Sequence, residues 1–220
     1  GIGNVAIGKG SMESHTTGYY NSALGYRSLK SNTTGQANVA LGSGSLYLNT
    51  NGNNNVAIGL NSGYSLNTSG NVLIGNYSGY SLTSGSGSVS IGANSLQNNE
   101  TGSYNTVIGQ GVGENIDGGN SNTILGHQSG KNIISGNNNT LLGGGSDITS
   151  LNDLSSPNQI SNSTAIGFES VVSASNAIQL GNSNVTLVET SGVVSATGAN
   201  ISGTVTATKF SGDGSGLTGL

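Results

Sequence analysis

A short apolar run that ends in glycine recurs along the chain, as in Asn4-Val-Ala-Ile-Gly8 and Asn55-Val-Ala-Ile-Gly59. The closing glycines follow each other at intervals of 17 residues, with one interval of 16, and they are Gly8, Gly25, Gly42, Gly59, Gly75, Gly92, Gly109, Gly126 and Gly143. Runs of β-branched and apolar residues bounded by glycine predict strands, and no segment has a helical period. A unit of 17 residues is too short to bury a core of its own, so the units must stack. The sequence therefore predicts an all-β parallel β-solenoid (a β-roll) with one 17-residue coil per repeat.

The second half of each repeat carries one further apolar residue in either of two places. Serine stands three residues after most closing glycines, and Leu29 or Leu46 follows it directly. Where glycine takes that place, the apolar residue moves three positions on, as at Leu66 and Leu82. This half predicts a second, weaker strand and a glycine-rich turn.

Alternation along the first strand assigns its residues to two faces. We expect the flanking positions of each strand to form the coil core: Val5, Ile7, Leu24, Val39, Leu41, Val56, Ile58, Ile74, Ile91, Ile108, Leu125 and Leu142. The middle positions then point outward, and all but Ser90 are apolar: Ala6, Ala23, Ala40, Ala57, Leu73, Val107, Ile124 and Leu141. An apolar stripe along a rod is typical of a protein–protein surface. The middle column is therefore predicted to be the interface through which identical rods associate side by side.

The regular repeat breaks after Gly143 and divides the chain. Residues 1–143 are predicted to be the regular solenoid, and residues 144–163 an inserted loop that is the best candidate for a lateral contact. Residues 164–187 hold coils shortened to 14 residues, between Gly167 and Gly181. Residues 188–220 predict a β-rich neck and a Gly/Ser linker to a further C-terminal region.

Composition excludes several functions. The 220 residues include 5 basic and 9 acidic side chains and no cysteine, for a net charge of −4. So few cations give no electrostatic footprint for nucleic acid or for an anionic membrane. No apolar run approaches the ~20 residues of a membrane-spanning helix. Without cysteine there is neither a disulfide framework nor a thiolate metal site.

The phrase Asn-Val-Ala-Ile-Gly-x-x-Ser resembles the head repeat of trimeric autotransporter adhesins, and the stretch from Ser163 to Gly181 is closest to that form. The 17-residue version, as at Asn55-Val-Ala-Ile-Gly-Leu-Asn-Ser-Gly-Tyr-Ser-Leu, is similar to repeats of phage tail-fibre proteins. In those proteins, segments like Ala207-Thr-Lys-Phe-Ser-Gly-Asp-Gly precede a C-terminal chaperone. The resemblance implies a left-handed β-roll, a homotrimer and an extracellular or virion location.

Enzyme chemistry finds little support in the sequence. The phrase Ile7-Gly-x-x-Ser11 also fits hexapeptide acyltransferases, but it occurs once per coil, and the histidines His15 and His127 are seven coils apart. Glycosidases need paired carboxylates, for which the sequence offers Glu114 with Asp117 and Asp147 with Asp153. Surface charge explains these residues better, although three chains could bring their acids together.

Metal binding is likewise weakly indicated. Gly143-Gly-Gly-Ser-Asp147 is similar to the calcium nonapeptide of β-rolls but occurs only once, and such sites need stacked copies. We therefore predict no catalytic residue, no metal site and no cofactor, with an ion on a trimer axis left as an alternative.

Three tyrosines recur at one coil position, five residues after the closing glycine. These are Tyr47, Tyr64 and Tyr80, which should stack as a ladder between coils. The structural interpretation is favoured, and the alternative is a contact site for a cell-surface saccharide. Taken together, the sequence predicts a non-enzymatic, trimeric tail-fibre or adhesin segment that displays a host- or surface-binding tip. A bacterial surface adhesin or filament is the alternative, and a depolymerase of tailspike type comes after it.

Overall fold

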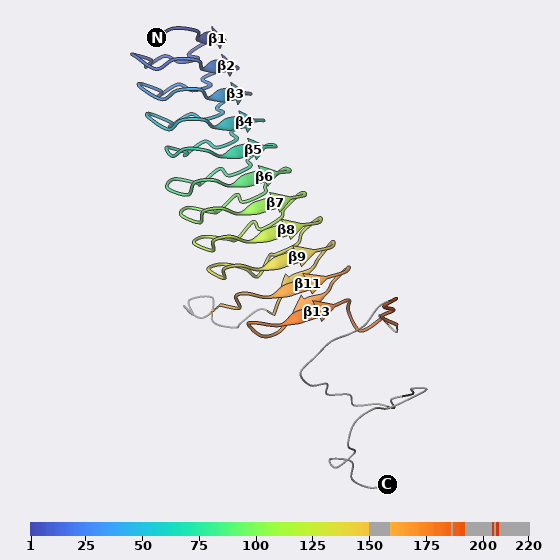
Figure 1. The fold of residues 1–220 in the computed structure, drawn as a ribbon. Helices are drawn as coiled ribbons and strands as arrows, with labels where there is room; N and C mark the ends of the chain where they lie inside the picture. The colour runs from blue at the N-terminus through green and yellow to red at the C-terminus, as the bar shows by residue number, and fades with distance from the viewer. Residues whose placement is uncertain (150–158, 186, 192–203, 205, 207–220) are drawn as a thin grey trace. The chain divides into compact units, whose positions relative to one another are not determined.

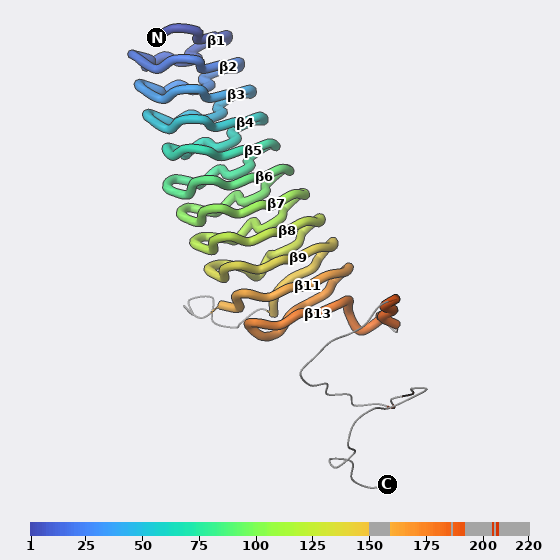
Figure 2. Tube along the Cα trace, viewed as in Figure 1, coloured from blue at the N-terminus to red at the C-terminus, as the bar shows by residue number. Residues whose placement is uncertain are grey.

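The computed structural model describes residues 1–149, 159–185, 187–191, 204 and 206. Within them the chain is all-β, and residues Gly1–Val185 form one compact unit. Figure 1 shows about ten stacked turns, each with one short strand on the same side. The tube in Figure 2 follows the same path from coil to coil, so the predicted parallel β-solenoid is confirmed.

Eleven strands form one parallel sheet in sequence order. They are β1 (Val5–Ile7), β2 (Ser22–Leu24), β3 (Val39–Leu41), β4 (Val56–Ile58), β5 (Val72–Ile74), β6 (Val89–Ile91), β7 (Thr106–Ile108), β8 (Thr123–Leu125), β9 (Thr140–Leu142), β11 (Thr164–Ile166) and β13 (Ile178–Leu180). Neighbouring strands pair in strict register, for example Val39 with Val56 and Leu41 with Ile58. Equivalent residues of successive repeats therefore lie in straight columns along the sheet.

The closing glycines are required by the backbone of each corner. From Gly8 to Gly167 they have φ between 121° and 142°, a region that residues with a side chain rarely adopt. A Cβ atom on any of those from Gly8 to Gly143 would also overlap the carbonyl group of the equivalent glycine in the next coil. Both the conformation and the close stacking of coils thus explain why this column is invariant within the chain.

The structure reverses the predicted inside and outside of the strands. The middle residues of the second to ninth strands are buried; those predicted to be the interface are Ala23, Ala40, Ala57, Leu73, Val107, Ile124 and Leu141, each at most 1% exposed. Ala6 is exposed because no coil covers it on its N-terminal side. The predicted core residues lie outward: Val5, Ile7, Leu24, Val39, Leu41, Ile108 and Leu125 are 37–57% exposed, and Val56, Ile58, Ile74, Ile91 and Leu142 are half-buried. A three-residue strand directs only its middle side chain inward, and the second half of the coil fills the remaining space.

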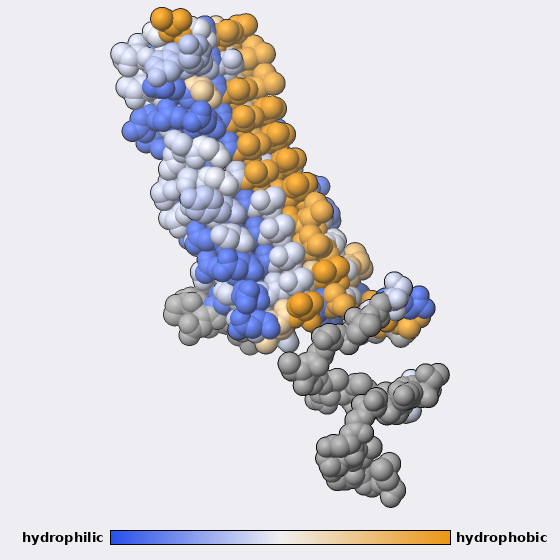
Figure 3. All heavy atoms as spheres, in the orientation of Figure 1, coloured by the Kyte–Doolittle hydropathy of each residue, from blue (hydrophilic) through white to orange (hydrophobic). Residues whose placement is uncertain are grey.

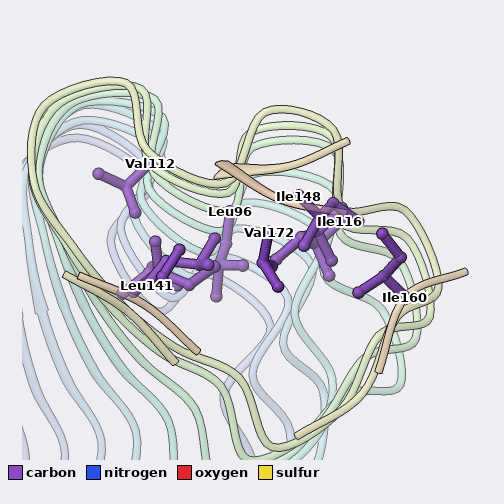
Figure 4. Close-up of a cluster of buried hydrophobic side chains, with 11 residues drawn as sticks. Leu96, Val112, Ile116, Leu141, Ile148, Ile160 and Val172 are labelled. Atoms are coloured by element: carbon purple, nitrogen blue, oxygen red, sulfur yellow. The ribbon is translucent and has the colours of Figure 1, made fainter. Parts of the chain in front are cut away.

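The interior is packed in two alternating ways. In most coils with a small middle residue, such as Ala40, a leucine four residues after the closing glycine fills the coil, as Leu46 does; Ala57, which goes with Gly63, is the exception. Where the strand carries a large one, such as Leu73, that place is glycine, because a Cβ on Gly79 would lie 2.9 Å from the Leu73 side chain. The apolar residue then sits three positions further on, as at Leu82, which is fully buried. Figure 4 shows such side chains inside the coil outline.

A buried serine cluster separates the apolar interior into two parts. Ser90 takes the middle position of β6, and its Oγ lies 3.0 Å from Ser78 Oγ and 2.7 Å from Ser95 Oγ. One apolar cluster extends from Met12 to Leu82 and the other from Leu96 to Val172. Since all three hydroxyls are hydrogen-bonded, this polar break in the apolar interior leaves none of them without a partner.

Asparagines form a hydrogen-bonded ladder at the start of the strands. The Asn38 side-chain amide donates to Asn21 Oδ1 at 3.1 Å and to the Gly52 carbonyl at 2.8 Å. Asn55 repeats the first contact with Asn38. Because the ladder satisfies buried amide and carbonyl groups at each corner, it holds successive coils in one register.

The insertion is shorter than predicted, because residues on both sides of it continue the coil. Strand β10 (Asp147–Ile148) pairs with β12 (Val171–Val172), and β9 pairs directly with β11. Residues 150–158 lie outside the described part. The 14-residue coil is present, since Thr164 pairs with Ile178. Most of the predicted neck and linker at 188–220 lies outside the described residues.

Candidate interaction surface

The outward positions of the strands form two columns, which we call the exposed stripe; the first is mostly valine and then threonine, and the second is apolar throughout. The first column is Val5, Ser22, Val39, Val56, Val72, Val89, Thr106, Thr123 and Thr140, and the second is Ile7, Leu24, Leu41, Ile58, Ile74, Ile91, Ile108, Leu125, Leu142 and Ile166. Figure 3 shows an apolar band along the solenoid that is broader in the N-terminal half than in the C-terminal half. It is flat because every strand is three residues long and in register with its neighbours.

Two features vary along the exposed stripe. The first column changes from valine to threonine at Thr106, so its C-terminal half presents hydroxyls beside the second column's isoleucines and leucines. Near the N-terminal end, Ser22 stands between Val5 and Val39 and leaves a wholly apolar hollow of about 270 Å³. A side chain from another molecule could enter this hollow without burying any polar group.

The sequence does contain a signal for the correct face. In most coils the middle strand residue varies inversely in size with the residue four positions after the closing glycine: Ala23 goes with Leu29, Leu73 with Gly79 and Ile124 with Gly130. The exception is Ala57 with Gly63, where a Cβ would meet Leu73 of the next coil. Such compensation requires that the two residues share one interior. The outward columns show no comparable compensation, which marks them as the outside.

The tyrosine ladder forms as predicted, and its geometry favours the structural interpretation. The rings of Tyr47 and Tyr64 stack with centroids 4.8 Å apart, and those of Tyr64 and Tyr80 with centroids 5.2 Å apart. The Lys30 Nζ atom lies 5.3 Å from the Tyr47 ring centroid and donates a hydrogen bond to the Tyr47 hydroxyl. Because the tyrosines cover each other's faces, they offer ring edges where a pyranose would need an open face. A saccharide contact at this ladder stays a prediction.

The candidate carboxylates serve local structure. Asp117 Oδ1 accepts a hydrogen bond from the Glu100 backbone amide at 3.2 Å, which caps a corner. Asp147 is 8% exposed and accepts hydrogen bonds from the backbone amides of Asn132 and Ile148. Burial raises the pKa of Asp147 to about 6, against the opposing effect of these amides. Its proposed partner Asp153 lies outside the described residues.

The two histidines lie on different coils, far apart along the solenoid. His15 sits at a corner, where its Nε2 lies 3.0 Å from the Gly18 carbonyl oxygen. His127 is exposed on a coil near the C-terminal end of the solenoid. In the described part of the chain, no three His, Asp or Glu side chains gather closely enough to hold a metal ion. Nor does any helix of the described residues have the length and apolarity to cross a membrane.

Comparison with known proteins gives no match that bears on these surfaces. No protein-family profile matches the chain, and no curated protein matches it significantly. The exposed stripe is therefore the feature on which a functional argument must stand.

Proposed function

We propose that this chain is a structural fibre segment whose copies associate side by side through the exposed stripe. The stripe itself carries the proposal. An exposed apolar patch on a typical monomer covers roughly 300–600 Å². With its isoleucines, leucines and valines ranging from half-buried to 57% exposed over some ten coils, the stripe offers on the order of 1,000 Å² per copy, which is comparable with the ~800 Å² per partner of a standard interface.

The assembly we propose is a parallel homotrimer with the exposed stripe facing a common axis. Flat, in-register columns can meet equivalent columns of other copies along their whole length. We take three-fold symmetry from the resemblance to tail-fibre and adhesin repeats. In this proposal the trimer axis runs beside the flanking columns, whereas the sequence had predicted it beside the middle column. The segment would act as a stiff extracellular or virion shaft that displays a host- or surface-binding tip.

The test is to place charge in the exposed stripe without touching the coil interior. In the double variant Ile58→Asp/Ile74→Asp, we expect a folded chain that sediments as a monomer, because a buried, unpaired carboxylate is costly. Asn98→Asp is the matched control, since Asn98 is exposed and lies outside the stripe. An assembly that survives the double substitution would contradict the proposal.

The bacterial surface adhesin remains the alternative context. It shares the solenoid and the trimer, so the stripe does not separate it from a phage fibre. Sequencing the reading frame beyond residue 220 does: an intramolecular chaperone domain there favours the phage fibre, and a membrane-anchor barrel favours the adhesin.

A further inference from the structure

A hollow of about 530 Å³ lies on three successive coils near the C-terminal end of the solenoid. Its floor is Gly144 and Gly145, the first two residues after a closing glycine. The preceding coil borders it with His127, Gln128 and Lys131, and the following coil with Phe168 and Glu169. A coil with no side chains at these two places, between coils that have large ones, thus leaves a gap in the surface.

The backbone at the rim of the hollow carries a conformational cost. The second residue after each closing glycine has φ near 50–70°, and glycine fills this place at Gly10, Gly44, Gly111 and Gly145. Gln128 and Glu169 hold φ of 55° and 51° although they are long side chains. A left-handed non-glycine residue costs about 1–2 kcal/mol. Arg27, Asn61, Tyr77 and Asn94 hold the same conformation at this place in other coils, so the cost belongs to the repeat and the hollow is distinguished by its lining instead.

Phe168 provides an open aromatic face. It is 67% exposed, and its ring lies over Gly144, where a Cβ would come within 3.7 Å of Cδ2. In contrast to the stacked tyrosines, no aromatic ring of the described residues stacks on it. Exposing a ring of this size to water is unfavourable unless a ligand covers it.

The polar groups around this ring are mixed in charge. Lys131 supplies a cation, Glu169 and the buried Asp147 supply carboxyl groups, and Gln128 supplies an amide. No sign predominates, which disfavours a strongly charged ligand. Hydroxyl groups can donate to carboxylates and accept from an amide or ammonium group, so a polyhydroxylated ring matches the set.

We propose that this hollow binds one hexopyranose unit of a saccharide, with the C–H face of the sugar on Phe168 and its hydroxyls hydrogen-bonded to Glu169 and Gln128. The volume lies within the usual range for small-molecule sites. All the lining residues belong to one chain, so the proposal does not depend on trimer assembly. The site also differs from the tyrosine ladder, which lies on other coils.

Saturation-transfer NMR on the full chain tests this directly. The probes are methyl α-glucopyranoside, methyl β-galactopyranoside, N-acetylglucosamine and glucuronic acid, each at millimolar concentration. We expect saturation of the aromatic protons to reach the C–H protons of at least one sugar. Phe168→Ala should weaken that binding by about tenfold or more, the loss expected for removing one well-placed contact of roughly 1.4 kcal/mol.

Two further variants make the result decisive. Tyr104→Ala removes a ring that is equally exposed at 66% but lies outside the hollow, and it should leave binding unchanged. Glu169→Gln keeps Phe168 in place and should weaken binding severalfold. Absence of transfer to all four sugars, or transfer that persists in Phe168→Ala, would overturn the proposal.

Discussion

The middle and flanking positions of the same strands are both apolar, yet the coil covers only the middle ones. Leu73 is fully buried, whereas its neighbours Val72 and Ile74 face outward and are half-buried. The difference shows that apolarity alone does not identify the inside of a solenoid. The inside is identified by complementary packing: in most coils the middle residue is large where the residue across the coil is small, and small where that residue is large. The flanking residues show no such relation.

The largest effect on stability should follow a substitution that disrupts the stacking of coils, on which both faces of the strands depend. Gly92→Ala places a Cβ against the Gly109 carbonyl at φ 139°, so we expect a loss of at least 3 kcal/mol in the free energy of unfolding. Gly70→Ala is the matched control, because its φ is 77° but no atom lies within 4 Å of the new Cβ. It should lose only about 1 kcal/mol. Urea unfolding followed by circular dichroism measures both values, and equal losses would refute the steric argument.

Truncating neighbouring residues of one strand should separate the two faces. Leu73→Ala opens a cavity inside the coil and should cost about 2–5 kcal/mol. Ile74→Ala removes a half-buried side chain and should cost about 1 kcal/mol or less in the monomer. Urea unfolding at protein concentrations below association gives both numbers. A larger loss for Ile74→Ala than for Leu73→Ala would mean that the flanking residues, and not the middle ones, form the coil interior.

Asp147 is the one acidic residue at a place where the other coils have an apolar residue or glycine, so its charge should make the last coils sensitive to pH. Its pKa is about 6 in the folded chain, above the ordinary value of 3.8, so the folded state binds more protons between these values. Stability should therefore fall as pH rises from about 4 to about 6 and then level off, by up to roughly 3 kcal/mol. Hydrogen exchange of the last coils measures this dependence.

Asp147→Asn provides the control for the pH dependence, because an amide does not titrate. The variant should show no slope between pH 4 and 6 in the amide protection of the last coils. A slope that persists in Asp147→Asn would assign the effect to another group.

The smallest effect should come from changing the polarity of one residue in the exposed stripe, and it should appear in the association of the chains. Thr123→Val replaces a hydroxyl by a methyl group of the same shape and extends the valine column of the N-terminal half. Since burying an unpaired hydroxyl is unfavourable, association should tighten severalfold in sedimentation equilibrium. Thr34→Val, at an exposed site away from the stripe, should have no effect on association. Unchanged association in Thr123→Val would place the C-terminal half of the stripe outside the interface.

Periodicity was sufficient to predict the coil, its 17- and 14-residue lengths and the stacked tyrosines. These features repeat, so each is supported by many equivalent residues. The faces of the strand were predicted in reverse, because alternation defines two faces without saying which is inside. The hollow beside Phe168 was missed for the opposite reason: it depends on Gly144, Phe168 and Glu169, which no other coil has at these places and which meet only when particular coils are stacked.

The mass of the unmodified chain in solution, measured by light scattering, tests the central claim most directly. A single chain has a mass of 21.7 kDa. The proposed fibre predicts three times that mass, stable on dilution and lost in Ile58→Asp/Ile74→Asp. A mass of one chain at every concentration would contradict it, and the exposed stripe would then have to serve a different partner.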